Sequence, residues 1–322
     1  MSLRSLVAKT LFFTLTALAL PSWAVYPDKP VKLLVGYGPG GATDIIARLL
    51  SKYLTDKWGQ AVVVENKPGA SGMIAALEVV RSTPDGYTLL LGYTPEVSIN
   101  KLVFETMRYD PITDLTAIAL AAEAPLVLAV GPKVSAKSFK DLLTHAQSSA
   151  PLTYGSPGVG GQQHMAGEML SIATKLPMTH IPYKGTGPAV AALVGGQIDL
   201  FFATTPPLLG QIKAGKVIPL AVAGSKREKL LPEVPTFVDL GYPKIQLTNW
   251  FGLFGPKNLP IAVLTSLTNG VVDALKDPSV VKALEEQGLT PRPMVGNDFV
   301  EFIQAELKMY APIIQAANIK AE

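Results

Sequence analysis

The sequence of 322 residues predicts an α/β protein of two domains, with mostly parallel sheets flanked by helices. Apolar runs of strand length alternate with segments of helical periodicity along most of the chain, which is typical of parallel sheets. The length exceeds what one hydrophobic core usually serves, and this favours two domains. The 28 glycines and 27 prolines fit many short turns between strands and helices.

The first 24 residues are typical of a secretory signal peptide. Arg4 and Lys9 precede an apolar stretch at residues 11–20, and Ser22-Trp23-Ala24 has the small-x-small pattern of a cleavage site. The stretch is too short to span a bilayer, and no later stretch offers about 18 uninterrupted apolar residues. We therefore expect cleavage near Ala24 and an exported, soluble protein. We take it to be a monomer.

Composition excludes several classes of function. Cleavage would remove two of the 28 basic residues, which leaves 28 − 2 = 26 against 25 acidic residues, a net charge of +1. That near-neutral balance argues against nucleic acid as a partner. The chain has no cysteine, which excludes disulfides, thiolate metal sites and a cysteine nucleophile.

The first predicted strand, residues 31–35, and the first predicted helix, residues 45–54, flank a glycine-rich loop. Glycines let the backbone approach a ligand closely, and a helix start offers unpaired N–H groups and the positive end of its dipole. Thr43 or Asp44 is expected to cap the helix. We interpret the loop as an anion site with these candidate binding residues: Tyr37, Gly40, Gly41, Ala42, Thr43 and Asp44.

Two other uses of this loop can be tested against its residues. A Walker A loop needs Lys and then Ser or Thr after its last glycine, whereas Gly41 is followed by Ala42, so that use is excluded. Residues 36–41 satisfy the letters of the dinucleotide fingerprint, and Glu65 stands near the expected acidic position. Nucleotide binding and a purely structural turn therefore stay open as alternatives.

The next elements bring further side chains to the same edge of the predicted sheet. After a strand at residues 61–64, a glycine-rich loop at residues 68–72 and a short helix, a third strand at residues 87–91 ends near Tyr93 and Thr94. Ligands of such sheets bind at the carboxyl ends of the strands. Tyr93 and Thr94 are therefore predicted to border the first loop.

A second unit repeats this order of strand, glycine-rich loop and helix. Strands at residues 126–130 and 152–154 precede the loop at residues 155–161, after which a helix begins. Its candidate binding residues are Ser156, Gly158, Gly160, Gly161, Gln162 and His164. Two such units more than a hundred residues apart predict one anion site in each domain, facing each other across a cleft.

The remaining elements complete the second domain and return to the first. A strand ends near Tyr183 and Lys184, and a buried strand at residues 198–202 ends near Thr204, so these three residues are further candidates for ligand contact. Two further strands are expected at residues 217–223, which we take as the return crossing, and at residues 249–254. Two helices are expected at residues 262–275 and 298–309, and Asn297 is the expected N-cap of the second of them.

Two polar residues, His164 and Ser156, could also take part in metal binding or catalysis. His164 and Glu168 stand four apart on a helix, a spacing that two metal ligands use, but no third ligand pattern accompanies them. For His164 we prefer a hydrogen bond that braces the Ser156 loop, with direct ligand contact as the alternative. Ser156 lacks the first glycine of the G-x-S-x-G elbow, so we interpret it as a hydroxyl that donates to a ligand oxygen rather than a nucleophile. No metal, cofactor or catalytic residue is predicted.

Three other interpretations stay open on sequence grounds. Asp44 is either a helix cap or a selector for a donor group on the ligand, and Lys184 either pairs with a ligand carboxylate or is solvated. Trp250 and Phe251 are typical of a core, with lining of the cleft as the alternative.

Short motifs over nearly the whole remaining chain resemble the Bug-type receptors, the extracytoplasmic solute-binding proteins of tripartite tricarboxylate transporters. Each motif alone is weak, but their order along the chain is specific. Besides the two glycine-rich loops they include Tyr26-Pro27-Asp28-Lys29-Pro30, Val64-Glu65-Asn66-Lys67-Pro68-Gly69-Ala70, Pro84-Asp85-Gly86-Tyr87-Thr88, Tyr109-Asp110-Pro111, Pro182-Tyr183-Lys184-Gly185, Gly196-Gln197-Ile198-Asp199, Pro232-Glu233-Val234-Pro235-Thr236 and Trp250-Phe251-Gly252-Leu253.

The resemblance implies a two-domain periplasmic-binding-protein clamshell, similar to type II, in which strands cross twice between the domains. We place domain 1 at residues 25–123 plus 223–322 and domain 2 at residues 124–222. Bug-type receptors hold a carboxylate mainly through backbone N–H groups and water from two loops. Where the family usually has Ser or Thr after the second loop's glycines, this chain has Gln162, so an inherited hydroxyl contact is not expected there.

The leading hypothesis is a periplasmic receptor that captures a small organic carboxylate, whether a di-, tri- or aromatic carboxylate, for the membrane permease subunits of a tripartite tricarboxylate transporter. Tyr93, Thr94, Tyr183 and Thr204 would then select among substrates. The alternatives are an exported α/β hydrolase-like enzyme that uses Ser156, and a receptor that reports its ligand to a sensor kinase.

Overall fold

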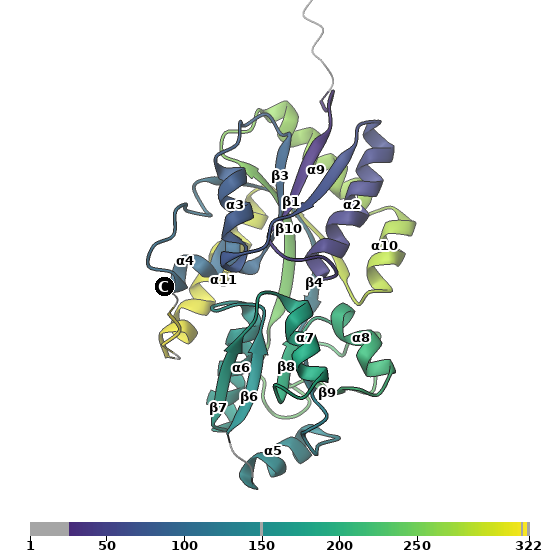
Figure 1. Cartoon of the computed structure of the whole chain (residues 1–322). Coiled ribbons are helices and arrows are strands. Elements are labelled where there is room, and N and C mark those ends of the chain that lie inside the picture. The colour runs from purple at the N-terminus through teal and green to yellow at the C-terminus, as the bar shows by residue number, and fades with distance from the viewer. Residues whose placement is uncertain (1–25, 149–150, 317, 321–322) are drawn as a thin grey trace, which may run out of the picture.

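The computed structural model describes residues 26–148, 151–316 and 318–320, which form two lobes joined by crossing strands (Figure 1). The predicted signal peptide, residues 1–24, lies outside the described residues. Across the described ranges, no helix combines the length and the apolar character needed to cross a membrane.

The first lobe, at the top of Figure 1, is built on a six-stranded sheet. Its strands are β1 (Val31–Val35), β2 (Val62–Asn66), β3 (Thr88–Tyr93), β4 (Leu115–Pro125), β10 (Thr248–Pro256) and β11 (Thr290–Val295). Their order in the sheet is β11-β4-β10-β3-β1-β2. Strands β1, β2 and β3 pair in parallel, whereas β10 pairs antiparallel with both of its neighbours. The helical elements are α2 (Ala42–Trp58), the 3-10 turn η1 (Ala70–Gly72), α3 (Met73–Val80), the π-helical turn η2 (Pro95–Ile99), α4 (Asn100–Val103), α9 (Ile261–Ala274), α10 (Pro278–Glu285) and α11 (Gly296–Ala316).

The second lobe is built on a five-stranded sheet with the order β7-β6-β8-β5-β9. Its strands are β5 (Val127–Val130), β6 (Leu152–Ser156), β7 (Met178–Pro182), β8 (Leu200–Ala203) and β9 (Ile218–Val222). Strands β6, β7 and β8 pair in parallel, and β5 pairs antiparallel with β8 and β9. Its helices are α5 (Phe139–Ser148), α6 (Gln162–Thr174), α7 (Thr186–Val194) and α8 (Thr205–Lys213).

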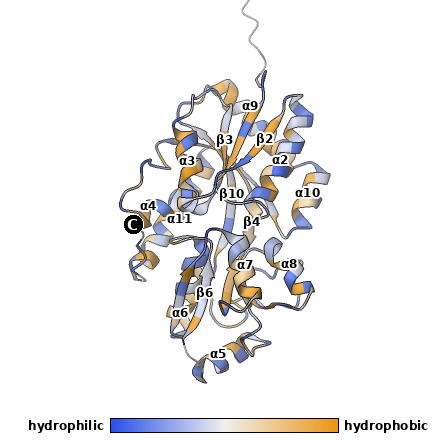
Figure 2. Cartoon of the chain, in the orientation of Figure 1, coloured by the Kyte–Doolittle hydropathy of each residue, from blue (hydrophilic) through white to orange (hydrophobic). Residues whose placement is uncertain are grey.

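Helices cover both faces of each sheet because the strands are apolar on both sides. Along β1, Leu33 packs in a core with residues of α2 and α9, whereas Leu34 packs in another core with residues of α3 and α11. Leu128 and Ala129 of β5 divide between the two faces of the second sheet in the same way. Figure 2 shows both colours along α2, as expected for a helix with one buried side.

Two strand crossings join the lobes at adjacent points, and the C-terminal part of α11 also reaches the second lobe, where Tyr310 and Ile314 pack in its core. β4 runs into β5 through Leu126, whose N–H donates to the carbonyl oxygen of Leu247 (3.3 Å) just before β10 begins. We predicted the return crossing at residues 217–223, and the structure corrects this, since β9 is an edge strand of the second sheet. Phe237 and Ile245 also pack in the second lobe's core. The domain boundaries remain a proposal, and these contacts favour moving residues 223–247 to the second lobe.

Several elements differ from the sequence prediction for identifiable reasons. The strand β4 was missed because it is rich in alanine, which has low strand propensity. The strand β11 contains Pro291 and Pro293, which are tolerated because it lies at the edge of its sheet. The prolines that begin α8 resemble a turn but are accepted in a first helical turn. Helix α11 begins at Gly296, so Asn297 lies inside its first turn and is not its N-cap.

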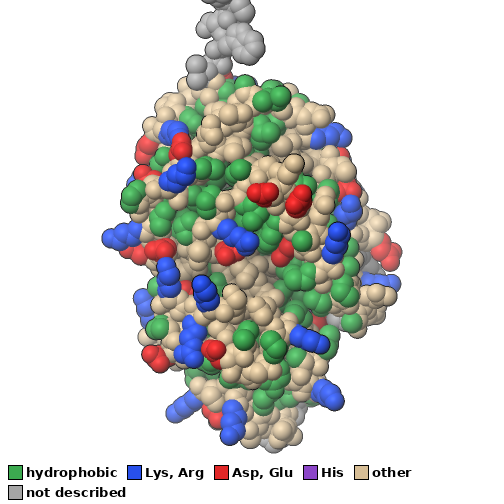
Figure 3. All heavy atoms as spheres, turned by 180° about the vertical axis from the view of Figure 1, so that it is seen from behind, with side chains coloured by type: hydrophobic (Ala, Val, Ile, Leu, Met, Phe, Trp, Pro, Cys, Tyr) green, Lys and Arg blue, Asp and Glu red, His purple; other side chains and the backbone are tan. Residues whose placement is uncertain are grey.

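The face opposite to that of Figure 1 carries charges of both signs. Figure 3 shows basic and acidic side chains interspersed over both lobes on that face, rather than gathered into one patch of a single sign. Such a distribution gives this face no strong field for a polyanion.

Candidate ligand-binding site

Two adjoining cavities lie between the lobes. Cavity A, of about 270 Å³, is lined by the first glycine-rich loop and the start of α2 from one lobe and by residues 184–188 from the other. Cavity B, of about 460 Å³, is lined by residues 68–72 from the first lobe and by residues 157–158 and 183–185 from the second. Tyr37 and Lys184 line both cavities, so the two form one site between the lobes.

The start of α2 faces cavity A with its backbone donors free of side-chain caps. The N-cap is Gly41, in an extended conformation (φ −83°, ψ 168°), and none of the described side chains caps it. The first helical hydrogen bond runs from the Ile45 N–H to the Gly41 carbonyl oxygen (3.0 Å). The N–H groups of residues 42–44 therefore have no partner within the helix. This corrects the expected cap from Thr43 or Asp44.

Asp44 braces the loop instead of capping the helix. Its Oδ2 accepts hydrogen bonds from the Gly40 N–H (3.1 Å) and Arg48 Nε (3.0 Å), and its Oδ1 accepts one from Asn66 Nδ2 (3.0 Å). Burial alone would raise the pKa of Asp44, but the hydrogen bonds from Arg48, Gly40 and Asn66 together lower it below its ordinary value. Asp44 is thus an ionised carboxylate already paired within the first lobe.

The helix start that faces α2 from the second lobe belongs to α7. Its N-cap, Gly185, has a φ of 121°, which favours glycine, and no described side chain caps it. Thr186 and Gly187, in the first turn, line cavity A. Their N–H groups and the exposed Lys184 beside them give this side of the cavity a positive potential.

The loop predicted as the second anion site lies mostly behind the cavity. Helix α6 begins at Gln162, which is fully buried, and its Nε2 donates to the Thr248 carbonyl oxygen (3.1 Å) and the Tyr310 hydroxyl (2.7 Å). The Nδ1 of His164 accepts from the Gly160 N–H (3.1 Å), as the bracing interpretation predicted. From the first turn of α6, Gln163 is the residue that lines cavity A.

Ser156 is also part of this brace. Its Oγ donates to the Gly158 carbonyl oxygen (2.5 Å), so the Nε2 of His180, 2.7 Å away, donates to Oγ rather than accepting its proton. Burial lowers the pKa of His164 to about 4, and burial together with His164 lowers that of His180 to about 3. Ser156 is fully buried and lines neither cavity. This geometry speaks against the hydrolase alternative, which needs an accessible serine and a neighbouring base.

The structure brings together the predicted residues only in part. Those that line cavity A are Tyr37, Gly41, Ala42, Thr43, Asp44, Tyr93, Lys184 and Thr204. Gly158 and Tyr183 line cavity B. Seven predicted residues line neither cavity, and their contact with a ligand stays a prediction: Gly40, Thr94, Ser156, Gly160, Gly161, Gln162 and His164.

Other lining residues were not selected from the sequence. Phe251, left open between core and cleft, lines cavity A, whereas Trp250 packs in the core beside α11. The residues of cavity A that were missed include Gln163, Gly185, Thr186, Gly187, Pro188 and Asn249. The signal for most of them was the order of strand, glycine and helix at residues 178–188, a third copy of the pattern that we used for the two loops.

A buried acid, Glu96 of the π-helical turn η2, holds Tyr37 and Tyr93 in place. The Tyr37 hydroxyl donates to Glu96 Oε2 (2.7 Å), and the Tyr93 N–H donates to Glu96 Oε1 (2.8 Å). Glu96 is fully buried, and burial raises its pKa to about 8. At neutral pH it is therefore mainly protonated, and it adds little negative charge beside the cavity.

We expect the Glu96→Gln variant to gain stability over the unaltered protein as the pH rises from 5 to 8. Folded Glu96 keeps its proton up to about pH 8, whereas the unfolded carboxyl ionises near pH 4.5. The contribution of Glu96 is therefore full below pH 4.5 and is lost as the pH rises toward 8, while glutamine does not titrate. Measured by urea unfolding, the free energy of unfolding of the variant minus that of the unaltered protein should rise by about 1–3 kcal/mol between pH 5 and pH 8. An equal difference at both pH values would contradict this account.

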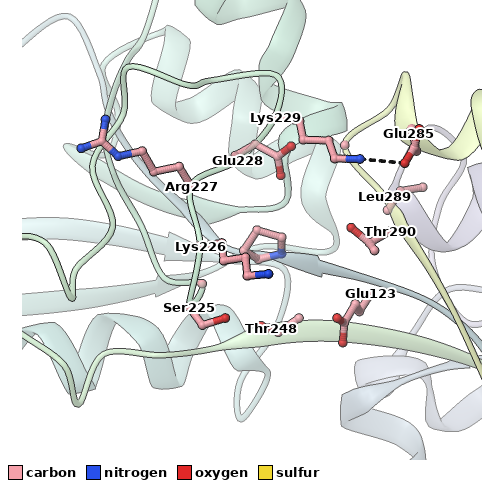
Figure 4. Close-up of a pocket in the computed structure, with 13 residues that line it drawn as sticks. Glu123, Ser225, Lys226, Arg227, Glu228, Lys229, Thr248, Glu285, Leu289 and Thr290 are labelled. Carbon is pink, nitrogen blue, oxygen red and sulfur yellow. Dashed lines mark hydrogen bonds and ion pairs between the residues drawn. The ribbon is translucent and has the colours of Figure 1, made fainter.

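A third cavity, of about 390 Å³, lies at the crossing strands (Figure 4). It is lined by Glu123 and Thr248 of the crossing strands, by the loop at residues 224–229 and by residues around the start of β11. Figure 4 shows Lys229 reaching Glu285, whose Oε1 is 2.8 Å from Lys229 Nζ. We call this third cavity the hinge cavity. It is lined by charges of both signs and by none of the predicted binding residues.

The described side chains offer no cluster of metal ligands. Over residues 26–148, 151–316 and 318–320 there is no group of three or more His, Cys, Asp or Glu side chains that could hold a metal ion. The chemistry that the geometry offers is the binding of an anion by backbone N–H groups and one lysine.

Known proteins share both the sequence and the fold. The family described as "Tripartite tricarboxylate transporter family receptor" matches residues 46–319. Protein BugT of Bordetella pertussis is 32% identical over 320 residues, which cover 98% of this chain and 98% of BugT. The solved structure of R. palustris Rpa4515 with adipate has a TM-score of 0.88 and 32% identity, over 92% of this chain and 99% of that one. The periplasmic binding protein BugD has a TM-score of 0.87 and 30% identity, over 92% of this chain and all (100%) of BugD.

These similarities confirm the predicted two-domain α/β fold of the periplasmic-binding-protein type. The expectation of mostly parallel sheets was wrong, since β10 and β5 pair antiparallel with both of their neighbours and each sheet is therefore mixed. The fold and the family are those of solute-binding proteins. The resemblance noted in the motifs is likewise confirmed. The chain belongs to the tripartite tricarboxylate transporter receptor family, and it is similar to the Bug-type receptors within it.

Proposed function

We propose that this protein captures a small organic carboxylate between its two lobes in the periplasm and passes it to the membrane permease subunits of a tripartite tricarboxylate transporter. The observation that supports this most is the pairing of two helix starts without side-chain caps, α2 and α7, on one cavity between the lobes. Rpa4515, a relative of 32% identity, holds adipate in its solved structure, which supports a carboxylate as the ligand class.

The charges around cavity A suit one carboxylate group. Backbone N–H groups at a helix start bind an anion without a dedicated arginine, and Lys184 adds one positive charge nearby. Asp44 is ionised, but Arg48 pairs with it (2.9 Å), and burial keeps Glu96 mainly protonated at neutral pH. Little unpaired negative charge therefore lies beside the ligand's carboxylate in cavity A.

Two hydrogen bonds across the cleft support closure of the lobes over a ligand. The Ser71 Oγ of the first lobe donates to the Val159 carbonyl oxygen of the second (3.2 Å), and the Tyr93 hydroxyl donates to Gln163 Oε1 (2.7 Å). Closure of this kind excludes water and strengthens each hydrogen bond to the ligand.

A thermal-shift screen against small organic acids, with monocarboxylates, dicarboxylates, tricarboxylates and aromatic carboxylates in the panel, tests the proposed function. A ligand at about 100 times its Kd should raise the melting temperature by about 5 °C, because it binds only the folded chain. Calorimetry would then give the affinity of each acid that produces a shift. No shift across the whole panel would contradict the proposal.

Replacing Lys184 with methionine should weaken binding of such a carboxylate by about 2- to 5-fold, because an exposed lysine contributes modestly to an ion pair. The remaining affinity should depend less on salt than that of the unaltered protein. The exposed Lys213 of α8 provides the matched control, and its methionine variant should bind as the unaltered protein does. Equal losses in both variants would mean that Lys184 does not act on the ligand directly.

A further inference from the structure

Three uncharged polar side chains line cavity A from three different parts of the fold. Tyr93 comes from β3 of the first lobe, Gln163 from α6 of the second lobe and Asn249 from the crossing strand β10. Their exposed fractions are 5%, 4% and 2%, so all three are more than nine-tenths buried. We call these three residues the amide subsite.

The hydrogen bonds within the amide subsite leave one donor and one acceptor available to a ligand. The Tyr93 hydroxyl donates its proton to Gln163 Oε1 (2.7 Å). The Asn249 side chain also stabilises the Tyr93 oxygen, and since the hydroxyl proton goes to Gln163, Asn249 can do so only through its amide nitrogen. Asn249 Oδ1 is buried and has no partner among the described residues. Gln163 also lines cavity A, and with its Oε1 taken by Tyr93 its amide nitrogen is the donor that this side chain offers to a ligand.

This balance does not depend on how the two amide groups are oriented. If both amides were turned, the Tyr93 hydroxyl would donate to Asn249 and accept from Gln163. One amide oxygen and one amide nitrogen would again be left for a ligand. The subsite therefore offers one acceptor and one donor in either assignment.

Packing holds the subsite in this arrangement. The Tyr93 ring stacks on Phe251, with ring centroids 5.5 Å apart, and the Tyr37 ring meets its edge at 5.3 Å. These aromatic contacts limit how far the hydroxyl can move toward other partners. Of the residues that line cavity A, the charged ones are Asp44, which is paired with Arg48, and Lys184. None of the three members of the subsite carries a charge.

We propose that the amide subsite recognises an uncharged group on the ligand that both donates and accepts a hydrogen bond, such as a hydroxyl or a carboxamide. This inference rests on the proposed function, with the ligand's carboxylate held at the starts of α2 and α7. A second carboxylate at the subsite would supply acceptors only and would leave Asn249 Oδ1 unpaired beside a negative charge. The preferred ligand class is thus a hydroxy- or carboxamido-monocarboxylate rather than a dicarboxylate of the same length.

Calorimetry at pH 7.5 with matched series of acids tests this preference. Each series has one carbon skeleton and one carboxylate, with hydrogen, a hydroxyl or a second carboxylate at the far end. The best-fitting hydroxy acid should bind about 10-fold or more tightly than both of its analogues, because only it satisfies the donor and the acceptor together. A dicarboxylate that binds as tightly as its hydroxy analogue, or more tightly, overturns the inference while the proposed function stands. If no acid in any series binds, the proposed function itself fails, and the inference fails with it.

Two variants test whether the preference for the hydroxy acid over the dicarboxylate comes from the amide subsite. In Asn249→Leu and in Gln163→Met the advantage of the hydroxy acid over the dicarboxylate should fall to within about 3-fold. Asn249→Leu should keep its affinity for the acid without a far group, whereas Gln163→Met also removes the cross-cleft bond from Tyr93 and should weaken all three acids alike. Residual binding together with cooperative urea unfolding shows that each variant is folded. Ser98→Ala is the control, because it removes a buried hydroxyl without a recorded partner that lies outside cavity A. An unchanged advantage in both subsite variants would overturn the inference.

Discussion

Replacing Ala42 with proline is expected to weaken carboxylate binding by about 10- to 100-fold while the protein stays folded. Ala42 is the first residue of α2 and lines cavity A, and proline there removes one backbone N–H from the predicted anion site. The first helical position tolerates proline because its N–H has no partner within the helix. Gly41 already has the extended conformation that a residue before proline prefers. Calorimetry would measure the affinity, and urea unfolding the stability.

The Ala42→Gly variant is the matched control, because it keeps the N–H group and should keep most of the affinity. Thr186→Pro makes the corresponding change at the first position of α7, and Thr186→Ala keeps that N–H. Each proline variant should lose affinity relative to its control. A folded Ala42→Pro protein that binds as tightly as Ala42→Gly would show that the start of α2 does not hold the ligand.

Replacing Gly36 with alanine is expected to lower the free energy of unfolding by about 1–3 kcal/mol and to weaken ligand binding. A Cβ atom on Gly36 would lie 2.7 Å from the Cα of Gly72 and 3.0 Å from its carbonyl oxygen. Both contacts are with backbone, so no side-chain rotation can relieve them. The first loop and the loop at residues 68–72 would have to move apart, and both line cavity B. Urea unfolding and calorimetry would measure the two losses.

Gly38→Ala is the control for this effect. Gly38 lies in the same loop, but a Cβ atom there would meet nothing within 4 Å, and its backbone is not in the left-handed region. Its stability should stay within about 0.5 kcal/mol of the unaltered protein. If Gly36→Ala is as stable as Gly38→Ala, the close approach of the two backbones does not position the loops.

The elements that the sequence marked correctly have both a hydrophobic pattern and glycine or proline at their ends. β1 is an apolar run that stops at Gly36, and α2 has buried Ile46, Leu50 and Leu54 at helical spacing before Gly59 ends it in a left-handed conformation (φ 66°). The return crossing could not be placed in this way. β9 and β10 are both apolar strands, and only their pairing partners show which of them leads back to the first lobe.

The candidate site shows the same limit. The order of strand, glycine and helix occurs before α2, before α6 and before α7, and no local feature shows which helix starts face a shared cavity. Packing decides this, since Gly160 lies against Val103 and α6 packs directly on Tyr154. Glu96 could not have been found from sequence, because glutamate is rarely fully buried and its burial depends on partners that are distant in sequence, such as Tyr37.

The central claim is that the starts of α2 and α7 together hold one carboxylate between the lobes. A crystal structure with a bound carboxylate tests it most directly. We expect carboxylate oxygens about 2.7–3.2 Å from backbone nitrogens of residues 42–44 on one side and of residues 186–187 on the other. A carboxylate found in the hinge cavity, or held by side chains alone with both helix starts away from it, would contradict the claim.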